Sequence, residues 1–211
     1  MGSRIMHLVI ANRILENVDV FDRTAFLLGG IAPDAVSPKE KSHFYSGEHH
    51  NYTRIIDYEA FYNKYNLLFD EDYIKGYYTH LIADDLWLQG FYLPWLKNRM
   101  EADEQLFKAY HRDFWFLNAK LIEYYGYQEE LIDTLNSNLP QIIDLEEVKQ
   151  QHVIDFTNYV LDDLHFDSQN INEKLEVFTL QQIVGYIETS IEQALYRLNQ
   201  HQIITKHNNN Y

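Results

Sequence analysis

Apolar residues recur every three to four positions through most of the chain, which is the spacing of one face of an α-helix. The long apolar segments lack the strict alternation of apolar and polar residues that is typical of a half-buried strand. The pattern predicts helices over residues 5–15, 55–68, 73–95, 101–126, 145–164 and 179–199. We therefore expect an all-α fold, a multi-helix bundle.

Capping and turn residues divide the stretch between the first two of these helices. Asp22 precedes the apolar run 24–28, which predicts a short helix with an acidic N-cap. Residues 31–35 contain a proline followed by an aspartate and predict a turn. Residues 38–51 are polar and rich in histidine, and we expect a long loop with little regular structure there.

The chain predicts one domain. Its 211 residues can bury a sizeable core, and no linker or shift in composition divides them. Gly90 and Pro94 interrupt the pattern of residues 73–95 without ending it. We expect the domain to span residues 1–205 and the polar, Asn-rich residues 206–211 to form a disordered tail.

Charge and hydropathy narrow the classes of partner. The formal net charge of −15 opposes binding to a phosphate backbone, so no nucleic acid duplex is expected as a partner. No apolar run approaches the roughly 18 residues of a membrane span. The apolar run near the N-terminus is too short for a signal-peptide core, which predicts a cytoplasmic location.

The strongest candidate for chemistry is a histidine and an aspartate within an apolar helical stretch. His80 and Asp84 are four residues apart, so both project from one face of the predicted helix. This spacing allows one helix to offer two ligands to one metal ion. A carboxylate buried among Leu81, Ile82 and Trp87 would be costly unless a positive group compensated it.

Three further polar residues occur in apolar or turn contexts. They are His7 in the first helix, Asp34 in the turn and His43 in the loop. The chain has no cysteine, so a metal must be held by nitrogen and oxygen ligands. Three imidazoles and two carboxylates suit one ion, or two ions that share a bridging carboxylate, of the Zn, Mn or Fe type.

Asp85 follows this pair but points away from their common face by more than a quarter turn. We expect it either to orient a ligand histidine through a hydrogen bond or to be solvated. Three other polar residues of the loop, Glu48, His49 and His50, are expected to be solvated.

These residues carry a resemblance to a known family. The order of four segments resembles the zinc-dependent phospholipase C family, which is related to bacterial phospholipases C and to fungal single-strand nucleases. The match covers roughly residues 1–90. The segments are Met6-His7-Leu8-Val9-Ile10-Ala11, Leu28-Gly29-Gly30-Ile31-Ala32-Pro33-Asp34, Ser42-His43-Phe44 and Gly76-Tyr77-Tyr78-Thr79-His80-Leu81-Ile82-Ala83-Asp84-Asp85.

The resemblance implies an all-helical, zinc-dependent phosphodiesterase fold and a ligand set. It implies that Asp34, His43, His80 and Asp84 hold the first zinc, and that Asp84 bridges to a second ion bound by His7. The family's remaining zinc uses a His-x-x-x-Glu pair, which does not occur here; His111 and Asp113 are the best spare candidates. We therefore expect one or two ions.

The function predicted from these patterns is hydrolysis of a phosphoester by a metal-activated water, on a small soluble phosphorylated substrate. Asp34 is predicted to act as both ligand and water-orienting base, with Asp85 as a second catalytic carboxylate. The main alternative is a helical binding or structural module with a non-catalytic metal or polar centre. A lesser alternative is an HD-type phosphohydrolase, whose adjacent His-Asp pair the chain lacks.

Overall fold

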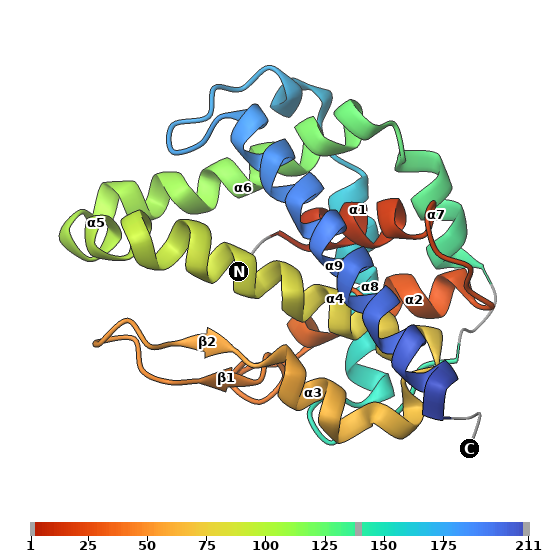
Figure 1. The fold of residues 1–211 in the computed structure, drawn as a ribbon. Coiled ribbons are helices and arrows are strands. Elements are labelled where there is room, and N and C mark those ends of the chain that lie inside the picture. Colours follow the sequence, from red (N-terminus) through yellow and green to blue (C-terminus); the bar gives the residue numbers. More distant parts are fainter. Residues whose placement is uncertain (1–2, 138–140, 209–211) are drawn as a thin grey trace.

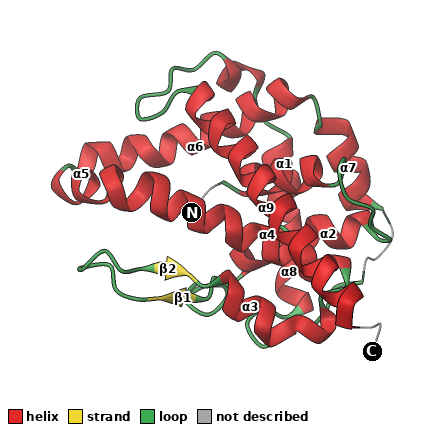
Figure 2. Ribbon diagram, viewed as in Figure 1, coloured by secondary structure: helices red, strands yellow, loops and turns green. Residues whose placement is uncertain are grey.

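Helices dominate the structure, as the sequence predicts. The computed structural model describes residues 3–137 and 141–208 (Figure 1), and strand within these residues is confined to one short hairpin (Figure 2). The α-helices are α1 (Arg4–Ile14), α2 (Arg23–Gly29), α3 (Tyr58–Tyr65), α4 (Asp72–Trp87), α5 (Lys97–Ala102), α6 (Glu104–Tyr125), α7 (Gln128–Asn136), α8 (Gln150–Leu164) and α9 (Leu180–Asn208).

Shorter elements connect these helices. The 3₁₀ turns are η1 (Ala32–Ala35), η2 (Asn66–Leu68) and η4 (Ser168–Ile171), and the π-helical segment η3 (Leu88–Leu96) continues α4. Strands β1 (Tyr45–Ser46) and β2 (Ile55–Ile56) pair in antiparallel fashion, with Tyr45 opposite Ile56.

The two helices that supply three of the predicted ligands lie at the centre of the molecule. α1 and α4 are buried on almost every side, and such all-round burial is the mark of a core helix. α4 contacts α2, α3 and α9, while α1 contacts α6, α8 and α9 (Figure 1). Most polar side chains on α1 and α4 are therefore removed from water.

Local capping explains where several helices begin and end. The predicted cap at Asp22 is confirmed, because its side chain accepts a hydrogen bond from the Ala25 amide at 2.9 Å. Asp57 caps α3 in the same way, so this helix begins at Tyr58 rather than at residue 55. Gly126 ends α6 in a left-handed conformation, with φ of 72°.

The structure differs from the predicted elements in several places. The loop predicted over residues 38–51 contains β1, and α7 was not predicted. The predicted helix 73–95 changes to π geometry after Trp87, around Pro94, which has no amide hydrogen to donate. Of the tail predicted over residues 206–211, residues 206–208 lie within the bounds of α9, and residues 209–211 lie outside the described residues.

Within residues 3–137 and 141–208, no helix is both long enough and apolar enough to cross a bilayer.

Two glycines allow α2 and α4 to approach closely. A Cβ atom on Gly76 would collide with the backbone carbonyl of Phe26, and one on Gly29 would collide with the carbonyl of Tyr73. The close approach also brings the Gly30 carbonyl to within 2.8 Å of Nδ1 of His80. The backbone contact between α2 and α4 thus fixes the orientation of a candidate ligand.

We predict that Gly76→Ala destabilises the fold by about 1–3 kcal/mol, because the added methyl group forces the two backbones apart. The control is Gly185→Ala on α9, where an added Cβ atom would have no neighbour within 4 Å beyond its own turns of helix. This control should stabilise the chain by about 0.5–1 kcal/mol through the lower flexibility of alanine. Urea unfolding of both variants measures the effects, and equal stability of the two would contradict this packing.

Candidate metal centre

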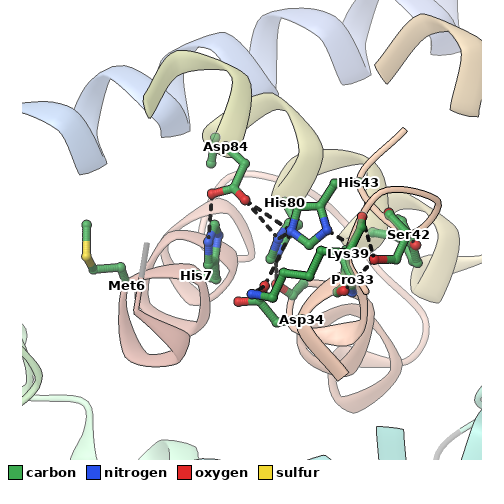
Figure 3. A network of polar contacts seen from close by, with 12 residues as sticks. Met6, His7, Pro33, Asp34, Lys39, Ser42, His43, His80 and Asp84 are labelled. Atoms are coloured by element: carbon green, nitrogen blue, oxygen red, sulfur yellow. Dashed lines mark hydrogen bonds and ion pairs between the residues drawn. The ribbon is translucent and has the colours of Figure 1, made fainter. Parts of the chain in front are cut away.

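The five predicted ligands come together in one buried cluster (Figure 3). His7 comes from α1, Asp34 from η1, His43 from the loop before β1, and His80 and Asp84 from α4. The Asp34 side chain is 5% exposed, and the other four are at most 1% exposed. Ionisable groups buried to this extent need partners of opposite charge.

Asp84 is the hub of the cluster. Its Oδ1 lies 3.2 Å from Nε2 of His7, and its Oδ2 lies 3.2 Å from Nε2 of His43 (Figure 3). The same Oδ2 lies 3.6 Å from Nε2 of His80. One carboxylate therefore faces all three imidazoles, with His7 on one oxygen and the other two histidines on the second.

Asp34 closes the cluster on its opposite side. Its Oδ1 lies 3.3 Å from Nε2 of His43 and also forms an ion pair with the ammonium group of Lys39. The imidazole of His7 stacks on that of His80, with ring centroids 3.7 Å apart.

Hydrogen bonds outside the cluster determine which ring nitrogens carry protons. Nδ1 of His80 must donate to the Gly30 carbonyl, because a carbonyl can only accept. The Ser42 hydroxyl donates to the Pro33 carbonyl at 2.8 Å, so it accepts from Nδ1 of His43 at 3.1 Å. If both rings are neutral, Nε2 of His80 and Nε2 of His43 each carry a lone pair, and these two atoms are 3.3 Å apart.

A second hydrogen bond holds the His43 segment in place. The Tyr77 hydroxyl on α4 donates to the Ser42 carbonyl at 2.6 Å. Ser42 is therefore fixed by the core through its carbonyl as well as through its hydroxyl, and it holds the neighbouring imidazole. Outer hydrogen bonds of this kind orient the histidines of metal sites and set their tautomers.

The pKa shifts show that the surroundings of both cluster carboxylates favour their ionised forms. Burial would raise the pKa of Asp84, but His7 and His43 hold it well below its ordinary value. Burial would also raise the pKa of Asp34, yet the His43 hydrogen bond and Lys39 hold it well below as well. Two carboxylate anions are thus enclosed in the core.

The imidazoles respond differently to the same surroundings. Burial, followed by the neighbouring His7, lowers the pKa of His80 to about 4, which keeps this ring neutral. Burial also opposes a charge on His43, but its hydrogen bonds to Asp34 and Asp84 raise its pKa overall. The two carboxylates thus stabilise a positive charge beside them, at His43, whereas His80 stays neutral.

The spacing of ligand atoms fits a metal ion. Two sets have ligand atoms that all lie within 4.8 Å of one another: His7, Asp34 and His80, and His43, His80 and Asp84. His80 belongs to both sets. Imidazole nitrogen and carboxylate oxygen suit Zn, Mn or Fe, so the residues present fit one ion or two neighbouring ions.

The cluster adjoins a cavity of about 920 Å³. Among the cluster residues, Asp34 lines this cavity, and its partner Lys39 lines it as well. Aromatic side chains from α6 and α8 form much of the wall; they include Phe107, Tyr110, Phe114, Trp115 and Phe156. A molecule in the cavity can therefore reach the cluster at Asp34.

The structure places Asp85 outside the cluster. Its Oδ1 accepts a hydrogen bond from the Ile56 amide at 2.9 Å, which ties α4 to β2. Burial raises the pKa of this carboxyl. The contact made by Oδ1 differs from the predicted hydrogen bond to a ligand histidine, and it gives Asp85 a structural role at the hairpin.

Other polar residues also differ from their predicted surroundings. His49, which was expected to be solvated, lines the cavity and lies against the Tyr92 ring. His111 lines the cavity too, whereas Asp113 accepts hydrogen bonds from the amides before α9, including that of Val177 at 2.7 Å. Asp113 thus holds a loop, and the structure does not bring it to the cluster.

Three residues that support the cluster from outside were not among the predicted site residues. Lys39, Ser42 and Gly30 act through a charge, a hydroxyl and a backbone carbonyl. Lys39 and Ser42 lie in a polar stretch, where the sequence gives no sign that a side chain is buried. Gly30 contributes its backbone carbonyl, a group that every residue has, so its residue type does not reveal the contact. Only the Ser42-His43 adjacency offered a sequence clue.

Comparisons of the chain with family models, with curated proteins and with solved structures found no match.

Asp85→Ala removes the acceptor of the Ile56 amide, and we expect a loss of stability of about 1 kcal/mol together with faster hydrogen exchange at Ile56. Asp70→Ala, at an exposed position before α4, is the control. Urea unfolding and amide exchange measure both effects; unchanged exchange at Ile56 would show that the contact does not hold the hairpin.

Proposed function

We propose that the chain is a metal-dependent phosphoester hydrolase, of the phosphodiesterase or phosphatase type, that acts on a small phosphorylated substrate. The observation that carries this proposal is the convergence of two facing imidazole nitrogens and two ionised carboxylates at the edge of a large cavity. The resemblance to the zinc-dependent phospholipase C family supports the same reaction class.

The residues that would hold the ion or ions are His7, Asp34, His43, His80 and Asp84. Zinc is the metal that the resemblance implies, and the donor set also suits manganese or iron. When bound, such an ion acidifies water and offsets the negative charge that grows on phosphate oxygens in the transition state.

Asp34 is the cluster carboxylate best placed to handle a proton. It lines the cavity, and its low pKa keeps it ionised at neutral pH. An ionised carboxylate at this point can orient a water molecule toward a phosphorus atom in the cavity and accept its proton. Asp84, His43 and His80 are buried behind it and can serve only as ligands or as a fixed electrostatic environment.

The aromatic wall has a separate role in this proposal. Rings from α6 and α8 face the organic part of an ester and displace water from the space beside Asp34. Lower water content strengthens the attraction between the cluster and the transition-state charge.

The alternative of a binding or structural module also has an observation in its favour. Four of the five cluster side chains are at most 1% exposed, as in a closed structural metal site. The access at Asp34 favours the hydrolase, because a structural site needs no opening toward a cavity of this size.

The proposal is tested with p-nitrophenyl phosphate and bis-p-nitrophenyl phosphate, with added zinc, manganese or iron(II). We expect hydrolysis of at least one ester, loss of activity with EDTA and recovery on adding the metal back. Asp84→Asn should lower the rate at least ~100-fold, because it removes a charged ligand that faces all three histidines.

Asp85→Asn is the matched control, since its amide oxygen can still accept from Ile56. We expect it to retain activity within about threefold, and a loss as large as that of Asp84→Asn would restore the predicted catalytic role of Asp85. Metal-loaded protein that hydrolyses neither ester, at any pH between about 5 and 9, would favour the binding module.

A further inference from the structure

Among the side chains that the structure describes, three from lysine or arginine line the cavity beside the cluster, and each has a carboxylate partner. Arg4 pairs with Asp163 at 2.8 Å, and Lys97 pairs with Glu101 at 3.0 Å. The third, Lys39, pairs with Asp34. In a chain with a net charge of −15, an anion that enters this cavity depends on these cations.

The partner of Lys39 differs from the other two. Asp163 and Glu101 lie outside the cluster, whereas Asp34 is one of its candidate ligands. The Asp34 oxygen that pairs with Lys39, Oδ1, is the same oxygen that faces Nε2 of His43 at 3.3 Å. An ion bound by this oxygen of Asp34 would therefore compete with the ammonium group for it and would repel that group.

Lys39 can move away from Asp34 without disturbing the core. Its side chain is 44% exposed, while that of Asp34 is 5% exposed. A lysine has a flexible four-carbon stem and binds phosphate as a point charge. The side chain is thus free to turn toward the cavity once another cation neutralises Asp34.

We infer that Lys39 is the phosphate-binding residue of this site: an ion in the cluster releases it from Asp34, and it then pairs with a phosphate oxygen of the substrate in the cavity. This inference rests on the proposed function, because the phosphate is that of the predicted substrate. It assigns Lys39 two states, a counter-ion of Asp34 without the metal and a substrate ligand with it.

The first test measures zinc binding and phosphate binding by isothermal titration calorimetry, without any reaction. Wild type, Lys39→Met and Lys41→Met are compared; Lys41 is exposed and lies outside the lining of the cavity, so it is a control of equal charge change. Zinc is titrated first, and inorganic phosphate is then titrated into desalted, zinc-loaded protein.

We expect Lys39→Met to bind zinc at least as tightly as wild type, because a competing cation has been removed. We expect it to bind phosphate at least tenfold more weakly, Lys41→Met to match wild type within threefold, and Lys39→Arg to recover most of the affinity. Circular dichroism confirms that the variants are folded.

Weaker zinc binding by Lys39→Met would overturn the inference, because the lysine would then support the cluster instead of competing for it. Equal phosphate binding by Lys39→Met and wild type would overturn it too, as would absence of phosphate binding by zinc-loaded wild type. If Lys39→Met loses phosphate but no ester is hydrolysed by wild type, the assignment of Lys39 holds and the proposed hydrolase fails.

Discussion

Two carboxylates buried among three imidazoles set the main constraint on this structure. Asp84 and Asp34 are removed from water, and the pKa of each is held well below its ordinary value. Burial of an ion costs several kcal/mol unless charge and hydrogen bonds compensate it. The surrounding helices are arranged so that each histidine presents a nitrogen to these oxygens.

The backbone contact between α2 and α4 is part of that arrangement. Gly29 and Gly76 let the two helices touch through their backbones, and this contact presents the Gly30 carbonyl to His80. On the other side of the cluster, Ser42 and Tyr77 fix the segment that carries His43. Packing in the core thus determines the tautomers of the neutral rings, in which the Nε2 lone pairs of His43 and His80 face each other.

Much of the fold could be predicted from the sequence because its helices follow strong local signals. The apolar period of 73–95 and the cap at Asp22 depend only on neighbours in the chain, and the structure contains both features. α7 was missed because its nine residues, with Leu131 and Leu135 as the buried positions, give too short a pattern. The hairpin was missed because each strand has only two residues.

The residues of the candidate site could be predicted from the sequence, but the contacts around them could not. His80 and Asp84 share a helix, so their spacing was visible, and the motifs of the resemblance added His7, Asp34 and His43. At Oδ1 of Asp85 the structure has a hydrogen bond from the Ile56 amide in place of the predicted contact with a histidine. Ile56 lies 29 residues away in the sequence, and only the fold brings it near Asp85. The pairing of Lys39 with Asp34 was missed for a different reason: the path of the backbone after η1 decides it, and residue types alone do not reveal that path.

The metal content of the purified protein shows whether this cluster binds a transition-metal ion. Plasma mass spectrometry on protein purified without added metal or chelator should find one or two zinc, manganese or iron ions per chain. The double variant His80→Ala/Asp84→Ala should hold none, while His111→Ala, in the same cavity, should match wild type. Wild-type protein that holds no metal, even after incubation with each ion, would show that the cluster is not a metal centre.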